Sequence, residues 1–316
     1  MPCEHVVVAL GPVDAGTVVP VLGERVTFVT DPTAEDLAVA EGAIVRADRQ
    51  VDGDLLARMP RLRVIARTGV GVELVDVAVA AARGIPVVVT PNSGSRAVAE
   101  GVLAMALHLT KRLSPLTELV REGRWAERAT LPVGDLDGAT LGIVGYGRIG
   151  RRVGELAAAF GMRTLAYDPF SPPPTEVARA DLGDLVAAAD VLTLHTPLTD
   201  DTRHLVDEHL LARVKPGAIL VNCGRGGLLD LDATLAALET GRLSGAGLDV
   251  FDPEPALYHP LFDHPNVVLT PHLMGMTRRA MTLTFADAAR GVADVLAGRP
   301  PAAVADPEQN HRKATA

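Results

Sequence analysis

Residues 141–150 read LGIVGYGRIG, an apolar run that leads into a turn containing three glycines. This order predicts a strand, a tight turn and the start of a helix. One glycine permits the turn, one lets the backbone approach a pyrophosphate, and one lets the helix pack closely on the strand. The helix N-terminus would face the phosphates. The residues predicted to bind a dinucleotide here are Gly145, Tyr146, Gly147, Arg148, Ile149 and Gly150.

An acidic residue follows at the end of the next apolar run, Thr164 to Tyr167. Asp168 lies 18 residues after Gly150, close to the spacing at which a carboxylate accepts hydrogen bonds from the adenosine ribose. The same negative charge would repel a 2′-phosphate. The pattern therefore predicts NAD (NADH) rather than NADP as the cofactor.

The chain has 316 residues and a formal net charge of −9. This length predicts about two domains, and the acidic balance argues against a general nucleic-acid-binding surface. No apolar run approaches the roughly 20 residues that span a bilayer, and Met1 to Leu10 lacks the pattern of a signal peptide. Cys3 and Cys223 give neither a disulfide framework nor the spacing of a metal site. We therefore expect a cytoplasmic protein with no metal, no membrane partner and no nucleic-acid partner.

Short apolar runs alternate with helical patterns along the chain, which predicts an α/β fold with parallel sheets covered by helices. In the first part, strands are expected at His5 to Leu10, Arg25 to Val29, Gly42 to Arg46, Leu62 to Ala66 and Pro86 to Thr90, and helices at Ala34 to Glu41, Gly53 to Met59 and Leu74 to Arg83. In the second part, six strands are expected at Thr140 to Val144, Arg163 to Tyr167, Val191 to His195, Ala218 to Asn222, Gly245 to Leu248 and Val267 to Leu269. Six strands in this order match a dinucleotide-binding domain.

Two helical segments connect these parts. Ser95 to Leu113 reads as one long helix, and its nearly continuous apolar content predicts burial against another domain or subunit. Met276 to Ala297 reads as a helix that returns the chain to the first part. We therefore expect two doubly wound parallel-sheet domains. A Rossmann NAD-binding domain at residues 95–275 would be inserted into a flavodoxin-like substrate domain at residues 1–94 plus 276–316.

Polar residues follow three of the expected strands at their carboxyl ends, where open α/β sheets bind ligands. They are Arg225 in a glycine turn, Asp249 and Glu254, and His272. Reduction of a 2-keto acid needs a proton donor and a cation that holds the carboxylate. His272 suits the first role because an imidazole titrates near neutrality, and Arg225 suits the second because a guanidinium binds carboxylates with two parallel hydrogen bonds. Glu254 would orient the imidazole and favour its protonated form.

Five motifs make this sequence similar to the D-isomer-specific 2-hydroxyacid dehydrogenase family over nearly its whole length. They are GYGRIG (145–150), HTPLT (195–199), VNCGRGGLLD (221–230), GAGLDVFDPEP (245–255) and NVVLTPH (266–272). The resemblance implies that Arg225, Glu254 and His272 are the catalytic residues of an NAD-dependent oxidoreductase. It also implies a homodimer built around the long linking helix, through residues 95–135.

The resemblance also implies which residues surround the cofactor and the substrate. Asp249 would contact the nicotinamide carboxamide, with help from the backbone around Cys223, whose thiol is expected to pack rather than react. The other residues expected to bind the cofactor are His195, Thr196 and Pro197 on the adenine side, with Thr202, Asn222, Gly224 and Gly275. In the first domain, the backbone amides of Val70 and Gly71 would hold the substrate carboxylate, beside Arg225 and His272.

Two arginines favour a phosphorylated substrate. Arg46 and Arg67 follow or end two expected strands and resemble positions at which phosphoglycerate dehydrogenases hold the substrate phosphate. Two guanidinium groups would suit a doubly charged group. The sequence is thus most like short phosphoglycerate dehydrogenases without a regulatory domain, and 3-phosphoglycerate is the expected substrate. The structural alternative is that Arg67 pairs with Glu73 or Asp76.

Other functions stay open on the sequence alone. They are reduction of glyoxylate or hydroxypyruvate, dehydrogenation of an acid that carries a phosphonate, phosphite-type or formate-type oxidation, and an NAD-responsive, corepressor-like scaffold. The plain DPEP context of Glu254 speaks against formate-type oxidation. The complete set of catalytic residues and the short polar tail speak against the scaffold.

Overall fold

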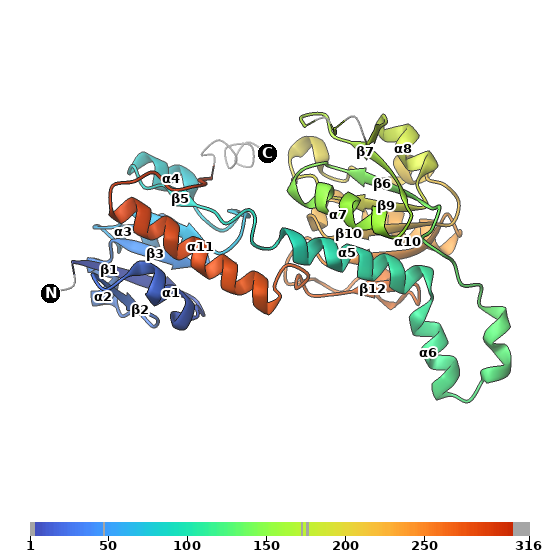
Figure 1. Cartoon of the computed structure of the whole chain (residues 1–316), viewed down its shortest axis with the longest axis horizontal. Coiled ribbons are helices and arrows are strands. Elements are labelled where there is room, and N and C mark those ends of the chain that lie inside the picture. Colours follow the sequence, from blue (N-terminus) through green and yellow to red (C-terminus); the bar gives the residue numbers. More distant parts are fainter. Residues whose placement is uncertain (1–3, 47, 172, 175–176, 306–316) are drawn as a thin grey trace. The chain divides into compact units, whose positions relative to one another are not determined.

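A computed structural model describes residues 4–46, 48–171, 173–174 and 177–305. Cys3 and the polar tail from residue 306 onward lie outside these ranges. The chain forms two compact units, Met1–Gly94 with Met276–Ala316, and Ser95–Gly275 (Figure 1). These limits coincide with the division expected from the sequence.

The first unit contains a five-stranded parallel sheet with the strand order β2-β1-β3-β4-β5. This is the order of flavodoxin-like doubly wound folds. Its strands are β1 (His5–Leu10), β2 (Val26–Val29), β3 (Gly42–Val45), β4 (Val64–Arg67) and β5 (Val87–Val88). Its helices are α1 (Ala15–Leu22), α2 (Ala34–Val39), α3 (Gly53–Ala57), α4 (Val77–Ala82) and α11 (Arg278–Leu296).

The side chains of alternate residues along these strands point into two hydrophobic cores, one on each face of the sheet. Val7 and Ile44 belong to the core beneath α1 and α11, whereas Val8 and Ile65 belong to the core on the other face, together with α3 residue Leu56. The sheet is thus buried on both sides, which explains why its strands are almost continuously apolar.

The chain returns to the first unit after α11 and adds a short antiparallel pairing to β5. Val88 bridges to Val304, and the backbone N–H of Ala305 donates to the carbonyl of Val87 at 2.8 Å. We did not expect this pairing from the sequence, because Ala302 to Ala305 carries no strand pattern of its own.

The second unit contains a seven-stranded parallel sheet with the order β12-β11-β10-β9-β6-β7-β8. Its strands are β6 (Thr140–Val144), β7 (Arg163–Tyr167), β8 (Ala178–Arg179), β9 (Val191–Leu194), β10 (Ala218–Asn222), β11 (Leu243–Leu248) and β12 (Val267–Leu269). Its α-helices are α5 (Ser95–Thr110), α6 (Leu113–Arg121), α7 (Arg148–Ala159), α8 (Leu182–Ala188), α9 (Glu208–Leu211) and α10 (Leu231–Glu239). Its 3₁₀ helices are η1 (Trp125–Thr130), η2 (Asp200–Thr202), η3 (Gly226–Leu228) and η4 (Pro260–Asp263).

Helix α5 packs on β11 through glycines of that strand. A Cβ atom added at Gly247 would lie 2.9 Å from Cβ of Met105, and one added at Gly245 would lie 2.8 Å from Cδ2 of Leu109. The absence of side chains at these two positions therefore lets the helix approach the sheet closely.

Two expectations for the second unit were wrong in detail. Strand β8 is a seventh strand; it has only two residues and both are exposed, so its sequence lacks the apolar signal of the others. The long helix expected from Ser95 to Leu113 ends at Thr110, and α6 starts separately after Arg112, whose φ is 50°. Pro115 is tolerated in the first turn of α6, whereas inside a continuous helix it would remove a backbone hydrogen bond.

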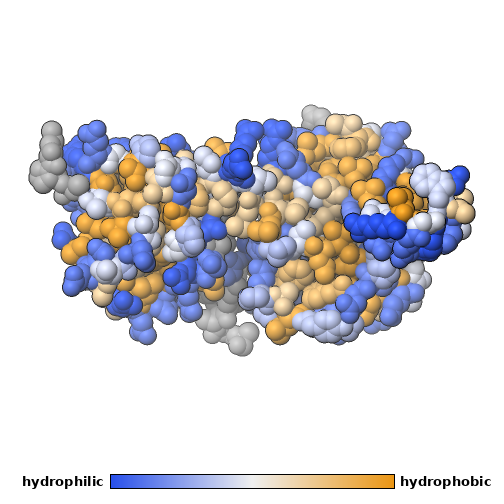
Figure 2. Space-filling model, turned by 90° about the horizontal axis from the view of Figure 1, so that it is seen from below, coloured by the Kyte–Doolittle hydropathy of each residue, from blue (hydrophilic) through white to orange (hydrophobic). Residues whose placement is uncertain are grey.

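Hydrophobic and hydrophilic side chains are interspersed over the face shown in Figure 2. Within the described parts of the chain, no helix is both long enough and apolar enough to cross a membrane. Several large hydrophobic side chains are nevertheless exposed in and after α6, namely Leu113, Val120, Trp125 and Val133.

Candidate active site

The predicted glycine turn lies between β6 and α7. Gly145 has a φ of 92°, and a Cβ atom there would lie 2.6 Å from the backbone of His195, so only glycine fits. At Gly147 an added Cβ would meet nothing within 4 Å. Gly147 is also the N-cap of α7, so open space adjoins the first turn of a helix of 12 residues. This arrangement fits a pyrophosphate.

Asp168 follows β7 directly and lies beside the glycine turn. Its Oδ2 accepts a hydrogen bond from the backbone N–H of Tyr146 at 2.8 Å, and its Oδ1 accepts from the N–H groups of Phe170 and Ser171. These bonds fix the carboxylate at the end of β7. Its contact with a ribose stays a prediction.

The segment after β9 closes the other side of the turn. Burial lowers the pKa of His195 to about 3, so its ring is neutral at physiological pH. Nε2 lies 3.0 Å from the hydroxyl of Thr193, while Nδ1 is buried and has no hydrogen-bond partner among the described residues. Further along, the Thr202 hydroxyl donates to the carbonyl of Pro197 at 2.8 Å, which fixes the path of the chain beyond Thr196.

His272 and Glu254 are in direct contact. Nδ1 of His272 lies 2.8 Å from Oε2 of Glu254, and Oε1 of Glu254 accepts a hydrogen bond from the backbone N–H of Phe251 at 3.0 Å. The His272 side chain is 51% exposed and that of Glu254 is 37% exposed. The pair is therefore held from one side and open to a ligand on the other.

Asp249 fixes the turn that carries His272. It is 2% exposed, and its Oδ1 accepts hydrogen bonds from the Thr270 hydroxyl at 2.6 Å and the Leu273 N–H at 2.9 Å. Oδ2 accepts from the N–H of Met274 at 3.2 Å. Sequence reasoning missed Thr270, although it stands two residues before the histidine in the LTPH motif. The expected contact of Asp249 with a nicotinamide carboxamide stays a prediction.

Arg225 stands in a turn that Asn222 shapes. The Asn222 amide is fully buried, donates to the carbonyl of Arg225 at 2.8 Å and accepts from the N–H of Gly224 at 3.0 Å. Gly226 packs directly against the backbone of Phe251. The turn of Arg225 therefore touches the loop that contains Glu254, and the unit brings the three expected catalytic residues to the same edge of its sheet.

Cys223 is a packing residue in this structure. Its Sγ lies 4.0 Å from Sδ of Met105. Burial, together with the charge of Asp249, raises the pKa of the thiol to about 12, so the thiolate is absent at neutral pH. Nowhere in the described part of the chain do three or more histidine, cysteine or acidic side chains gather in a way that could hold a metal ion.

An ion pair that the sequence did not reveal secures the loop of Glu254. Arg203 donates to Oδ2 of Asp252 at 2.8 Å, and a Cβ atom added at Gly227 would lie 2.7 Å from the same oxygen. The segment after η2, the turn after Arg225 and the Glu254 loop therefore meet at Asp252. Arg203 follows Thr202 directly, but nothing in its local sequence indicates this partner.

The residues expected to bind the substrate in the first unit have partners within that unit. Arg46 donates to Sδ of Met281 at 3.8 Å and lies over the ring of Phe285, 5.7 Å from its centroid. Arg67 is 4% exposed, and its Nε donates to the carbonyl of Gly71 at 2.9 Å. Arg67 thus shapes the glycine loop, while Val70 is 51% exposed. Their contact with a substrate stays a prediction.

The chain is similar in sequence to known proteins. Residues 103–274 match a family model described as D-isomer specific 2-hydroxyacid dehydrogenase, NAD binding domain. The D-3-phosphoglycerate dehydrogenase of Mycobacterium tuberculosis is 39% identical over 294 residues, covering 90% of this chain and 56% of that protein. The human D-3-phosphoglycerate dehydrogenase is 36% identical over 280 residues, 87% of this chain and 52% of that protein.

The chain belongs to the D-isomer specific 2-hydroxyacid dehydrogenase family. It spans about half the length of the curated relatives it matches. NAD is the cofactor of the matched domain, which confirms the prediction from the glycine turn.

Solved structures of similar proteins confirm the fold. The TT0316 protein from Thermus thermophilus is 35% identical with a TM-score of 0.86, covering 96% of this chain and 100% of that one. An NADPH-dependent glyoxylate/hydroxypyruvate reductase from Sinorhizobium meliloti is 27% identical with a TM-score of 0.85, covering 96% and 98%. A D-lactate dehydrogenase from Aquifex aeolicus, complexed with NAD and lactic acid, is 28% identical with a TM-score of 0.81, covering 93% and 96%.

Proposed function

We propose that this chain is an NAD-dependent oxidoreductase that interconverts a D-2-hydroxy acid and the corresponding 2-keto acid. The observation that carries the proposal is the contact between Nδ1 of His272 and Oε2 of Glu254 at 2.8 Å. Arg225 lies in a turn that touches the same loop. A proton donor, a carboxylate that orients it and a guanidinium are the groups that reduction of a 2-keto acid requires.

Each residue of the pair has a defined task in this proposal. Because Nδ1 of His272 is held by Glu254, Nε2 is the ring nitrogen that gives a proton to the substrate oxygen or takes it back. Glu254 is held in turn by the N–H of Phe251, so the imidazole keeps one orientation. Arg225 would bind the substrate carboxylate and polarise the neighbouring carbonyl.

The cofactor site lies in the same unit. When bound, NAD supplies the two-electron redox chemistry. The first turn of α7 would bind its phosphates, and Asp168 would accept hydrogen bonds from the adenosine ribose. The buried, neutral ring of His195 would hold the segment after β9 in place beside the glycine turn.

D-3-Phosphoglycerate is the substrate that we propose. The D-3-phosphoglycerate dehydrogenases at 36–39% identity support it, as does the presence of Arg46 directly after β3. Glyoxylate or hydroxypyruvate is the second candidate, favoured by the structural similarity to a glyoxylate/hydroxypyruvate reductase.

The experiment compares NADH oxidation with 3-phosphohydroxypyruvate, hydroxypyruvate and glyoxylate at neutral pH. We expect the highest kcat/KM with the phosphorylated acid. Arg46→Ala should reduce that preference by about tenfold or more, the effect of losing one charge-assisted contact to phosphate. Arg58→Ala, an exposed arginine of the same unit, is the matched control.

Equal activity with all three acids, unchanged in Arg46→Ala, would contradict the proposed substrate but leave the reaction class intact. Absence of turnover with every 2-keto acid tested, despite NADH binding, would contradict the reaction class itself and favour the scaffold.

We also propose a homodimer formed through residues 95–135. Helix α6 buries only Leu119 within its own chain, while Leu113 and Val120 on the same helix are 47% and 62% exposed. Trp125 in η1 is 63% exposed. A second copy covering this segment would remove that apolar surface from water.

A further inference from the structure

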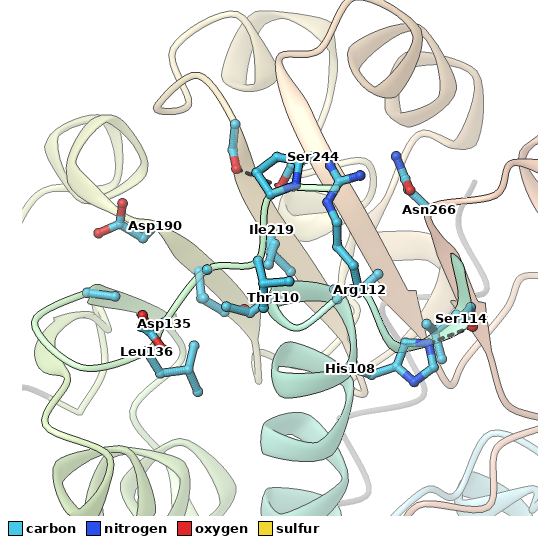
Figure 3. A pocket seen from close by; sticks show the side chains of 18 of the residues that line it. His108, Thr110, Arg112, Ser114, Asp135, Leu136, Asp190, Ile219, Ser244 and Asn266 are labelled. Atoms are coloured by element: carbon cyan, nitrogen blue, oxygen red, sulfur yellow. Dashed lines mark hydrogen bonds between the residues drawn. The ribbon is translucent and has the colours of Figure 1, made fainter. Parts of the chain in front are cut away.

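Strand β12 has a different surrounding at each of its ends. Asn266, just before its amino end, lines the pocket at the end of α5 that Figure 3 shows. Half of the residues that line this pocket belong to residues 95–135, so the second copy in the proposed dimer would cover it. Thr270 and His272 follow the carboxyl end of β12. The turn that they form therefore lies at the opposite edge of the sheet, in residues outside that segment.

The backbone of His272 adopts an uncommon conformation in this turn. Its φ is 55°, which lies in the left-handed region that residues with a Cβ atom rarely adopt. A residue keeps such a conformation only where the surrounding structure holds it, and residues of this kind cluster at active sites. The direction in which the imidazole points depends on this backbone, so the contacts that hold the turn also place the ring.

Hydrogen bonds hold the chain on both sides of His272. Before it, the hydroxyl of Thr270 donates to Oδ1 of Asp249 at 2.6 Å. After it, the backbone N–H groups of Leu273 and Met274 donate to the same carboxylate at 2.9 Å and 3.2 Å. The N–H of His272 itself donates to the carbonyl of Thr270 at 3.0 Å. One carboxylate therefore joins the two ends of the turn that carries the histidine.

Thr270 supplies the only side-chain donor to this carboxylate. Asp249 is 2% exposed, and in the described part of the chain its carboxylate accepts hydrogen bonds only from Thr270, Leu273 and Met274. None of these donors carries a charge, so the loss of one leaves a buried carboxylate short of hydrogen bonds. The hydroxyl of Thr270 is the one donor that a substitution can remove without altering the backbone.

We infer that Thr270 is a positioning residue for His272. Its hydroxyl fixes Asp249, and Asp249 fixes the turn. The turn then directs the imidazole so that Nδ1 lies 2.8 Å from Glu254 and Nε2 is left for the substrate. This inference rests on the proposed role of His272 as the proton donor. Thr270 acts through the histidine and needs no contact with either reactant.

Two substitutions at position 270 test this role with NADH and a 2-keto acid. Thr270→Val keeps the branched shape but removes the hydroxyl. It should lower kcat by about tenfold or more, because a displaced proton donor acts poorly. KM for the acid should change by less than about threefold, because Arg225 is untouched. Thr270→Ser keeps the hydroxyl and should retain kcat within about threefold. Thr240→Val removes a hydroxyl that donates to the carbonyl of Ala236 in α10 and should leave kcat unchanged.

A double-mutant cycle shows whether Thr270 acts through His272. In a His272→Ala background, Thr270→Val should lower the residual kcat by less than about twofold, because the group that Thr270 positions is already gone. A loss as large as that in the unmodified background would mean that Thr270 acts on something other than the histidine, and would overturn the inference. So would a kcat for Thr270→Val within about threefold of that of the unmodified chain.

Amide hydrogen exchange tests the turn without any need for turnover. In Thr270→Val the N–H of Leu273 should exchange about tenfold faster than in the unmodified chain, because the turn opens more often. The amides of β6 should keep their exchange rates, which shows that the second unit is still folded. An unchanged rate at Leu273 would overturn the inference. If the unmodified chain turns over no 2-keto acid, the proposed function fails, whereas the exchange rate at Leu273 still decides whether Thr270 holds the turn.

Discussion

Nδ1 of His272 lies 2.8 Å from Oε2 of Glu254, although the two side chains come from loops that follow different strands. We expect His272→Ala to lower turnover of a 2-keto acid by about hundredfold or more, since it removes the proton donor. NADH affinity should change little, because the glycine turn is untouched. Steady-state kinetics and NADH fluorescence titration measure the two effects separately. His209→Ala, on α9, is the control, and near-normal turnover in His272→Ala would show that another group donates the proton.

The negative charge of Asp168 is expected to determine whether the chain prefers NADH or NADPH. In Asp168→Asn one side-chain oxygen still accepts backbone hydrogen bonds, but the charge that repels a 2′-phosphate is gone. We expect the preference for NADH over NADPH to fall by about tenfold, the effect of about 1.4 kcal/mol of repulsion. The ratio of kcat/KM values with the two cofactors is the measurement. An unchanged ratio would assign cofactor choice to another residue.

Trp125 is expected to hold the proposed dimer together. A buried tryptophan is a frequent hot spot of an interface, so Trp125→Ala should weaken self-association by about tenfold or more. Sedimentation equilibrium at several protein concentrations gives the dissociation constant. Phe170→Ala removes another exposed aromatic side chain, 92% exposed, that lies outside residues 95–135 and should have no effect. A chain that is monomeric before any substitution would contradict the proposed dimer.

Glu41 makes the stability of the first unit depend on pH. Burial alone would raise the pKa of Glu41, but the hydrogen bonds and charges of Arg63 and His5 outweigh it and lower the pKa below its ordinary value of 4.5. This stabilisation is complete above that ordinary value and is lost as the pH falls through the lower folded-state value. Glu41→Gln should therefore lower the free energy of unfolding by about 1–3 kcal/mol at pH 7.

Urea unfolding followed by circular dichroism at pH 7 and at pH 3.5 tests this dependence. The difference between Glu41→Gln and the unmodified chain should shrink at the lower pH, because below the ordinary value of 4.5 Glu41 of the unfolded chain is protonated and folding must release that proton. Glu24→Gln, an exposed glutamate, should show no difference at either pH. If the difference in free energy of unfolding between Glu41→Gln and the unmodified chain is the same at both pH values, the charge of Glu41 does not contribute to stability.

Cys223 should prove chemically inert. Because burial and the charge of Asp249 raise the pKa of its thiol to about 12, alkylation by iodoacetamide at pH 8 should be far slower than for an exposed cysteine. A Cys3→Ser background leaves Cys223 as the single thiol for this measurement. Cys223→Ala should retain turnover within about threefold, because the proposed reaction needs no thiolate. Rapid alkylation coupled to loss of activity would instead indicate a reactive thiolate.

The sequence carried enough information to predict both sheets and the edge at which the catalytic residues meet. Apolar runs separated by helical patterns located the strands, and the rule that ligands lie at the carboxyl ends of parallel strands brought Arg225, Glu254 and His272 together. What it did not contain were contacts between residues distant in sequence. Arg203 and Asp252 are 49 residues apart, and neither has a local pattern that indicates the other.

Short elements without an apolar pattern were also beyond prediction. Strand β8 and the bridge between Val88 and Val304 depend on a neighbouring strand that offers free backbone groups, not on their own side chains. The break after Thr110 had a signal, Pro115, but the apolar content of the preceding helix outweighed it in our interpretation. The partners of Arg46 and Arg67 required the folded chain, because α11 and the glycine loop approach them only there.

The glycines of β11 that receive Met105 and Leu109 have a consequence for how this sequence can diverge. In each pair the two side chains share one limited space between the helix and the sheet. Alanine at position 247 would therefore clash with Met105, but it would fit if a shorter side chain replaced that methionine. Substitutions at positions 105 and 247 should therefore occur together, as should those at 109 and 245. Each pair of positions should covary in an alignment of sequences that descend from this chain.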